Sequence, residues 1–95
     1  MALEYRYYGP EAPTRYWGGK SVMLGEPQGP TVAVANGAAS DALAEGAYRI
    51  FITDARSRVD FGAGVTNGTD GEIWPADWCE VHYLPEGCKI GVSLA

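Results

Sequence analysis

The residues best suited to chemistry in this chain of 95 residues are two cysteines and a single histidine. Cys79 and Cys88 flank His82, and thiolate and imidazole groups are preferred ligands of Zn²⁺. A structural zinc site uses four such ligands, which these three side chains do not supply. If residues 78–84 and 88–94 pair as a hairpin, His82 also points to the opposite face from both cysteines. The pattern therefore predicts no metal site.

The same hairpin predicts the redox state of the cysteines. When Tyr83 lies opposite Cys88, Cys79 shares their face but sits four residues further along the ladder. At about 3.3 Å per residue that separation is roughly 13 Å, whereas a disulfide needs Cα atoms about 4.4–6.8 Å apart. We expect two buried, free thiols.

Three other patterns resemble functional motifs but lack an essential part. The run Gly62-Ala63-Gly64 begins like a dinucleotide-binding loop, without the third glycine or the helix that the motif opens. Asp70 and Asp77 are spaced somewhat as in a calcium loop, but Thr66 and Gly68 stand where the first ligands belong. No serine has a histidine and an acid that could share a site with it. We therefore expect no catalytic residues and no cofactor, and a structural or binding protein rather than an enzyme.

Composition and charge restrict the partners. The net charge is −5 and the sequence pI is near 4.6, and an acidic surface repels phosphate backbones, so no nucleic-acid partner is expected. No apolar run approaches the ~20 residues of a membrane helix, and no signal-peptide pattern follows the first residue. We expect a soluble product, synthesised in a cytoplasm, with no membrane partner.

The elements that position the side chains are predicted to be strands, because 13 Gly and 6 Pro interrupt the chain too often for long helices. Residues 47–61 alternate as a β-hairpin around a loop at residues 54–57. Its apolar face would carry Tyr48, Ile50, Ile52, Val59 and Phe61, and its polar face Arg49, Thr53, Arg58 and Asp60. Phe51 alone breaks the alternation. The polar face is interpreted as solvated or subunit-facing.

A second hairpin is predicted for residues 78–84 and 88–94, turned by Pro85-Glu86-Gly87. Its apolar face would carry Cys79, Val81, Tyr83, Cys88, Ile90 and Val92, and its polar face Glu80, His82, Lys89 and Ser93. Two hairpins with one apolar face each favour packing on each other. The sequence thus predicts an all-β fold, a small antiparallel, jelly-roll-like β-sandwich over residues 31–95, with further strands at residues 31–35 and 72–75.

Residues 1–30 are predicted to form an extended, aromatic N-terminal arm with short strands at residues 3–8 and 21–24. The aromatic residues of this segment either cover the open end of the core or dock on another subunit, since Tyr and Trp are enriched at interfaces. The candidate interface residues of the whole chain are Tyr5, Tyr7, Tyr8, Tyr16, Trp17, Trp74 and Trp78.

Four stretches of the second half occur in a familiar order, namely residues 48–55, 58–62, 74–76 and 84–92. Together they resemble small all-β virion proteins of tailed bacteriophages that are encoded among head genes and associate with the capsid surface. A strand ends in an acidic turn, a second ends in Phe61-Gly62, and Pro75-Ala76 and Pro85-Glu86-Gly87 turns precede the last strands. The resemblance covers residues 31–95.

This resemblance implies a capsid decoration, or cement, protein that bridges and stabilises subunits of the major capsid protein. It implies an oligomer, with a homotrimer favoured, located on the capsid surface of the virion. No catalytic residue comes with such a family. A head–tail connector or tail component of the virion is the alternative. A small cupin-like enzyme is a distant one, because it needs several histidine ligands and this chain has one histidine.

Overall fold

Short β-strands make up the regular structure of the chain. The computed structural model describes residues 2–10, 14–15, 22–23 and 27–95, and these residues contain no helix. The strands are β1 (Leu3–Tyr7), β2 (Thr14–Arg15), β3 (Val22–Met23), β4 (Val32–Val34), β5 (Ala38–Ala39), β6 (Gly46–Ile52), β7 (Ser57–Gly62), β8 (Glu72–Trp74), β9 (Cys79–Leu84) and β10 (Lys89–Leu94). The prediction of an all-β fold is confirmed.

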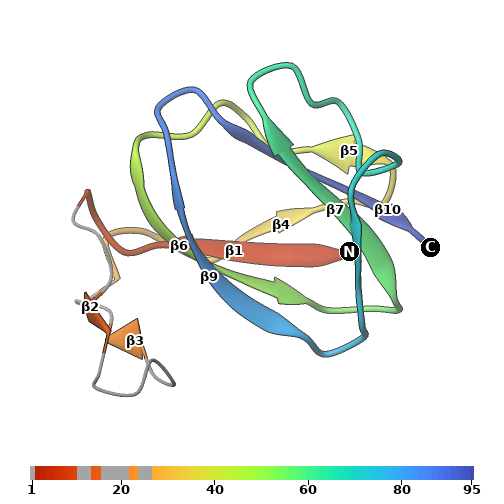
Figure 1. Cartoon of the computed structure of the whole chain (residues 1–95), viewed down its shortest axis with the longest axis horizontal. Coiled ribbons are helices and arrows are strands. Elements are labelled where there is room, and N and C mark those ends of the chain that lie inside the picture. Colours follow the sequence, from red (N-terminus) through yellow and green to blue (C-terminus); the bar gives the residue numbers. More distant parts are fainter. Residues whose placement is uncertain (1, 11–13, 16–21, 24–26) are drawn as a thin grey trace.

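Two four-stranded antiparallel sheets carry the fold, with strand orders β4-β1-β6-β9 and β5-β10-β7-β8. We call them the β6 sheet and the β7 sheet. Their inner faces share one core, whose most deeply buried side chains are Leu3, Ile50, Ile52, Ser57, Ile90 and Val92. Figure 1 shows β1 running alongside β6 and β7 alongside β10, while the β2–β3 pair lies beyond one end of the sheets, away from the C terminus.

The predicted hairpins are wrong as pairs of neighbouring strands. β6 pairs with β1 and β9, whereas β7 pairs with β10 and β8. Residues 53–56 therefore cross from one sheet to the other, and so do residues 85–88 between β9 and β10. Because β1 and β9 occupy both hydrogen-bonding edges of β6, no edge remains for β7. The apolar faces of β6 and β7 meet across the core instead of lying side by side.

The predicted face of β9 is also wrong. In the observed register Tyr48 lies opposite His82 and Gly46 opposite Leu84, so the even-numbered residues of β9 share the core-facing side of Tyr48. Leu84 is buried, while Tyr83, predicted to face the core, is 42% exposed. β9 is an edge strand of its sheet, so an inward-facing polar side chain there can still reach solvent.

β1 belongs to the two-sheet body, although the sequence grouped it with the N-terminal arm. It lies between β4 and β6 and places Leu3 and Tyr5 in the core. The strand predicted at residues 3–8 is observed at Leu3–Tyr7, but the body begins near residue 2 rather than at residue 31.

The loop of residues 63–71 covers the outer face of the β7 sheet. The Gly68 amide donates to the Ser93 hydroxyl on β10 at 3.1 Å, and Arg58 of β7 donates to the Gly71 carbonyl at 3.3 Å. Gly68 and Ser93 are buried in consequence. At Gly71 the approach is so close that an added Cβ would overlap the Val59 carbonyl oxygen and lie 2.7 Å from the Asp60 nitrogen.

Tyr48 makes the stability of the fold sensitive to alkaline pH. Its side chain is 2% exposed and its hydroxyl donates to the Ala44 carbonyl at 2.6 Å. Burial, followed by the nearby Tyr7 and Tyr5, raises the pKa of Tyr48 from 10.0 to about 12. A raised pKa means that the folded state holds the proton longer than the unfolded state, so its contribution is complete below pH 10 and is lost towards pH 12.

We therefore expect the free energy of unfolding to fall by roughly 2–3 kcal/mol from this group between about pH 10 and pH 12. Chemical unfolding across that range measures the loss, and Tyr48→Phe is the control. Tyr48→Phe also loses the hydrogen bond to Ala44, so the two proteins are compared by slope against pH. An equal slope in both proteins would show that Tyr48 is not the group responsible.

Candidate interaction surface

The outer face of the β6 sheet carries an unusual mixture of apolar and cationic side chains. Cross-strand register aligns Glu4 with Phe51 and Cys79 in one row, and Arg6 with Arg49 in the next. Val81 completes the second row. We call this surface the open face; its members are Glu4, Arg6, Arg49, Phe51, Cys79, Val81 and Tyr83.

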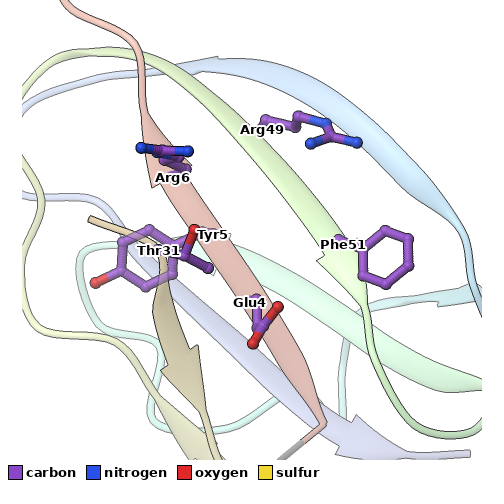
Figure 2. Close-up of a pocket in the computed structure, with 6 residues that line it drawn as sticks. All are labelled: Glu4, Tyr5, Arg6, Thr31, Arg49 and Phe51. Atoms are coloured by element: carbon purple, nitrogen blue, oxygen red, sulfur yellow. The ribbon is translucent and has the colours of Figure 1, made fainter. Parts of the chain in front are cut away.

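A hollow of about 240 Å³ lies on the open face over β1 and β6. Figure 2 shows the side chains that line it, with the two guanidinium groups of Arg6 and Arg49 on neighbouring strands and Glu4 and Phe51 further along. Tyr5 and Thr31 complete the lining on the side of β4. The hollow therefore combines two cations, one carboxylate and an aromatic ring.

Arg6 is held by its own chain, because its Nε donates to the Gly29 carbonyl at 3.0 Å. Arg49 is exposed, and interaction with Cys79 and then with Tyr8 raises the pKa of its guanidinium. Arg49 thus stays cationic at every physiological pH, and each guanidinium keeps further N–H donors for another partner.

The two outer faces differ in how they are covered. The 63–71 loop lies on the β7 sheet, where its close approach to β7 and β10 buries Gly68 and Ser93. On the β6 sheet, among the described residues, only the end of the face is covered: Ala47 donates to the Gly9 carbonyl at 2.9 Å and is buried. Phe51, Val81 and Cys79 remain partly exposed. The open face is thus the one broad sheet surface that the described part of the chain leaves available.

A second hollow, of about 350 Å³, lies at the side of the molecule where β8 and β9 form the edges of the two sheets. The His82 ring lies 4.8 Å from the Phe61 ring and stacks on Trp74 at 5.7 Å and 18°. The Glu80 carboxylate accepts from Trp78 Nε1 at 2.5 Å and contacts His82 Nε2 at 2.8 Å. His82 was predicted on a polar outer face, and its packing against these two rings is a correction that follows from the register of β9.

The predicted interface residues lie in different parts of the structure. Tyr5 is 8% exposed and packs edge-on against Tyr48 in the core. Tyr7 packs on the same Tyr48 ring at 4.9 Å and donates to the Glu45 carbonyl. Tyr8 is half-buried, with its amide bonded to the Ala47 carbonyl at 2.8 Å.

The two described tryptophans also differ in their exposure to solvent. Trp74 is 3% exposed and belongs to the core, whereas Trp78 is 47% exposed beside the second hollow. Tyr16 and Trp17 lie outside the described residues. Of the described candidates, Tyr8 adjoins the open face and Trp78 the second hollow, so the structure brings no two exposed candidates together.

The sequence did not predict that the residues of the open face lie on one surface. Arg49 was predicted on the polar face of the first hairpin and is exposed, but Arg6 was not singled out and Val81 was predicted to face the core. The available signal was Phe51, the apolar residue that breaks the alternation of β6 on the side of Arg49. An aromatic ring on an outer strand face is a sign of contact with something beyond the sheet.

Cys79 and Cys88 are both free, as predicted, but only Cys88 is buried and Cys79 is partly exposed. Their separation has a different cause from the one inferred, because β9 and β10 lie in different sheets. Within the described ranges, no group of three or more His, Cys, Asp or Glu side chains is placed to hold a metal ion, and no helix is present that could cross a membrane.

Comparison of the chain with protein-family models, curated proteins and solved structures finds no match.

Proposed function

We propose that this chain is a non-enzymatic structural protein of a bacteriophage virion, a decoration or cement protein that bridges and stabilises major capsid protein subunits. The virion context rests on the resemblance carried by residues 31–95. The mode of action rests on one observation, the open face of the β6 sheet opposite a β7 sheet that its own loop covers. A cement protein needs one broad surface for the shell and one for solvent.

The composition of the open face supports docking. Phe51 and Val81 are partly exposed apolar side chains next to Arg49, and Arg and aromatic residues are enriched in the centres of protein interfaces. The sheet beneath them is held on both sides, since β6 is paired along its whole length with β1 and β9. Such a surface docks without a large ordering cost.

A jelly-roll-like description of the sandwich is part of the proposal. From β4 onward, successive strands alternate between the sheets except for β7 and β8, which are neighbours in one sheet. That alternation favours the two interlocked Greek keys of a jelly roll, with β1 inserted between β4 and β6. The proposed arm is then limited to the segment after Pro10, which carries Tyr16 and Trp17.

A homotrimer is proposed from the resemblance, and association is supported by four strands, β4, β9, β5 and β8, that lie at sheet edges. Exposed edges are sites of unwanted pairing and are commonly covered by association. Ile73 of β8 is 47% exposed and Val32 of β4 is 38% exposed. Subunit contacts along these edges would leave the open face free for the shell, where many copies bind by avidity.

The test is to mix the purified protein with undecorated phage heads and measure bound protein and the melting temperature of the heads. We expect saturable binding and a higher melting temperature. Phe51→Asp should weaken binding at least about tenfold, because it buries a new charge in the interface centre.

Ala63→Asp is the control, since it adds the same charge at an exposed position of the 63–71 loop, which lies on the outer face of the other sheet. It should leave head binding unchanged. Absence of binding and of a melting shift with the unmodified protein would refute the decoration role. The native mass of the protein then distinguishes a cement protein from the alternative role. Three copies support a cement protein, and six or twelve support a head–tail connector or tail component.

A further inference from the structure

The Arg6–Arg49 pair has no evident structural reason to exist. The two residues lie directly opposite each other on neighbouring antiparallel strands, a position where like charges destabilise a sheet. None of the described carboxylates forms an ion pair with either arginine. The chain has only seven lysines and arginines against twelve acidic residues, so this local excess of positive charge is not a result of its composition.

Arg6 is also pre-organised. The bond from Arg6 Nε to the Gly29 carbonyl fixes the plane of that guanidinium and leaves its terminal nitrogens unengaged by it. Arg49, directly opposite on β6, is exposed. Two planar sets of N–H donors on adjacent strands match the oxygens of a planar anion, which guanidinium groups bind with two parallel hydrogen bonds.

The size and the rim of the hollow restrict the kind of ligand that can bind there. Its volume of about 240 Å³ is below the roughly 300–1,000 Å³ typical of small-molecule sites, and it suits one or two side chains of a protein. Phe51 offers an apolar wall beside the cations. Glu4 on the rim and the net charge of −5 disfavour a polyphosphate such as nucleic acid.

We propose that this hollow is a recognition site for an acidic segment of a partner protein, in which the Arg6 and Arg49 guanidinium groups bind a side-chain carboxylate and Phe51 packs on an adjacent apolar residue. This inference rests on the proposed function in one respect, that the segment belongs to the protein on which the open face docks. The site supplies specificity through charge, in a chain that otherwise repels acidic surfaces.

The test uses nuclear magnetic resonance on the isolated protein, with an acetyl-Ala-Glu-Phe-Glu-Ala-amide peptide at millimolar concentration as the probe. We expect shifts of the Arg6 and Arg49 Nε–Hε signals and of the amides near Phe51, and weaker shifts at high salt. The same peptide with Gln in place of Glu should cause no such shifts. Equal effects of both peptides, or no effect of either, would overturn the proposal.

Variants separate binding from a structural role. Arg49→Gln should lower the affinity for the Glu peptide about tenfold or more while leaving the melting temperature unchanged or higher, because it removes a like-charge contact. Arg56→Gln, at an exposed loop position, should change neither. Equal affinities of the two variants would overturn the proposal, as would a hollow already filled by a carboxylate of the same chain.

The result is distinguishable from a failure of the decoration role. Peptide binding at the hollow with no binding to heads would retain this site and refute the proposed function. Head binding that is unaffected by Arg49→Gln would retain the function and refute the site.

Discussion

A chain that begins at residue 9 should not fold on its own. The truncation removes β1, which lies between β4 and β6 and buries Leu3 completely and Tyr5 almost completely. Burial of two such side chains contributes about 1.5–3 kcal/mol each, and β4 would lose its only partner in the sheet. A small domain has only about 5–15 kcal/mol of net stability. Circular dichroism and one-dimensional proton spectra should show loss of cooperative unfolding.

The control is to return the missing strand as a separate peptide of residues 1–8. Strand addition to an open sheet position is a known route of peptide binding, so the peptide should restore cooperative melting in a concentration-dependent manner. A truncated protein that melts cooperatively without the peptide would show that β1 is an accessory strand. That outcome would support the predicted N-terminal arm of residues 1–30.

Replacing Gly71 by alanine should destabilise the protein by about 3 kcal/mol or more. The added Cβ would overlap the Val59 carbonyl and approach the Asp60 nitrogen at 2.7 Å, and backbone atoms inside a paired strand cannot move aside. The 63–71 loop would have to lift away from β7. Urea unfolding at neutral pH measures the change.

Gly64→Ala is the matched control, because it lies in the same loop and its added Cβ would meet no atom within 4 Å. It should be neutral or slightly stabilising, since alanine restricts the unfolded chain. Similar losses of stability in both variants would mean that the loop does not pack on the β7 sheet as described.

The sequence allowed the strands to be located but not their neighbours. Alternation identified Ile50, Ile52 and Val59 as core residues, and they are buried. The same alternation fits a hairpin and a crossing between two sheets equally well, because side-chain period reports which face is buried and not which strand lies alongside. β6 pairs with β1, which lies some forty residues earlier in the chain, instead of with β7. Local sequence patterns carry no signal of that pairing.

Edge strands account for the remaining errors. In β9, the apolar residues Cys79, Val81 and Tyr83 were assigned to the core by hydrophobicity, yet the register places His82 and Leu84 there. An imidazole packed against Phe61 and Trp74 can be half-buried at an edge and still keep its contact with Glu80. The open face could not be predicted from the sequence either. It forms only when β1, β6 and β9, which are distant in the chain, are aligned in one sheet.

The most direct test of the account is an electron-microscopy reconstruction of phage heads decorated with the protein. We expect density for the protein on the shell with the β6 sheet innermost, so that Arg49 and Phe51 contact the major capsid protein and the 63–71 loop faces solvent. Density in which the 63–71 loop contacts the shell, or heads that carry no such density after mixing, would contradict it.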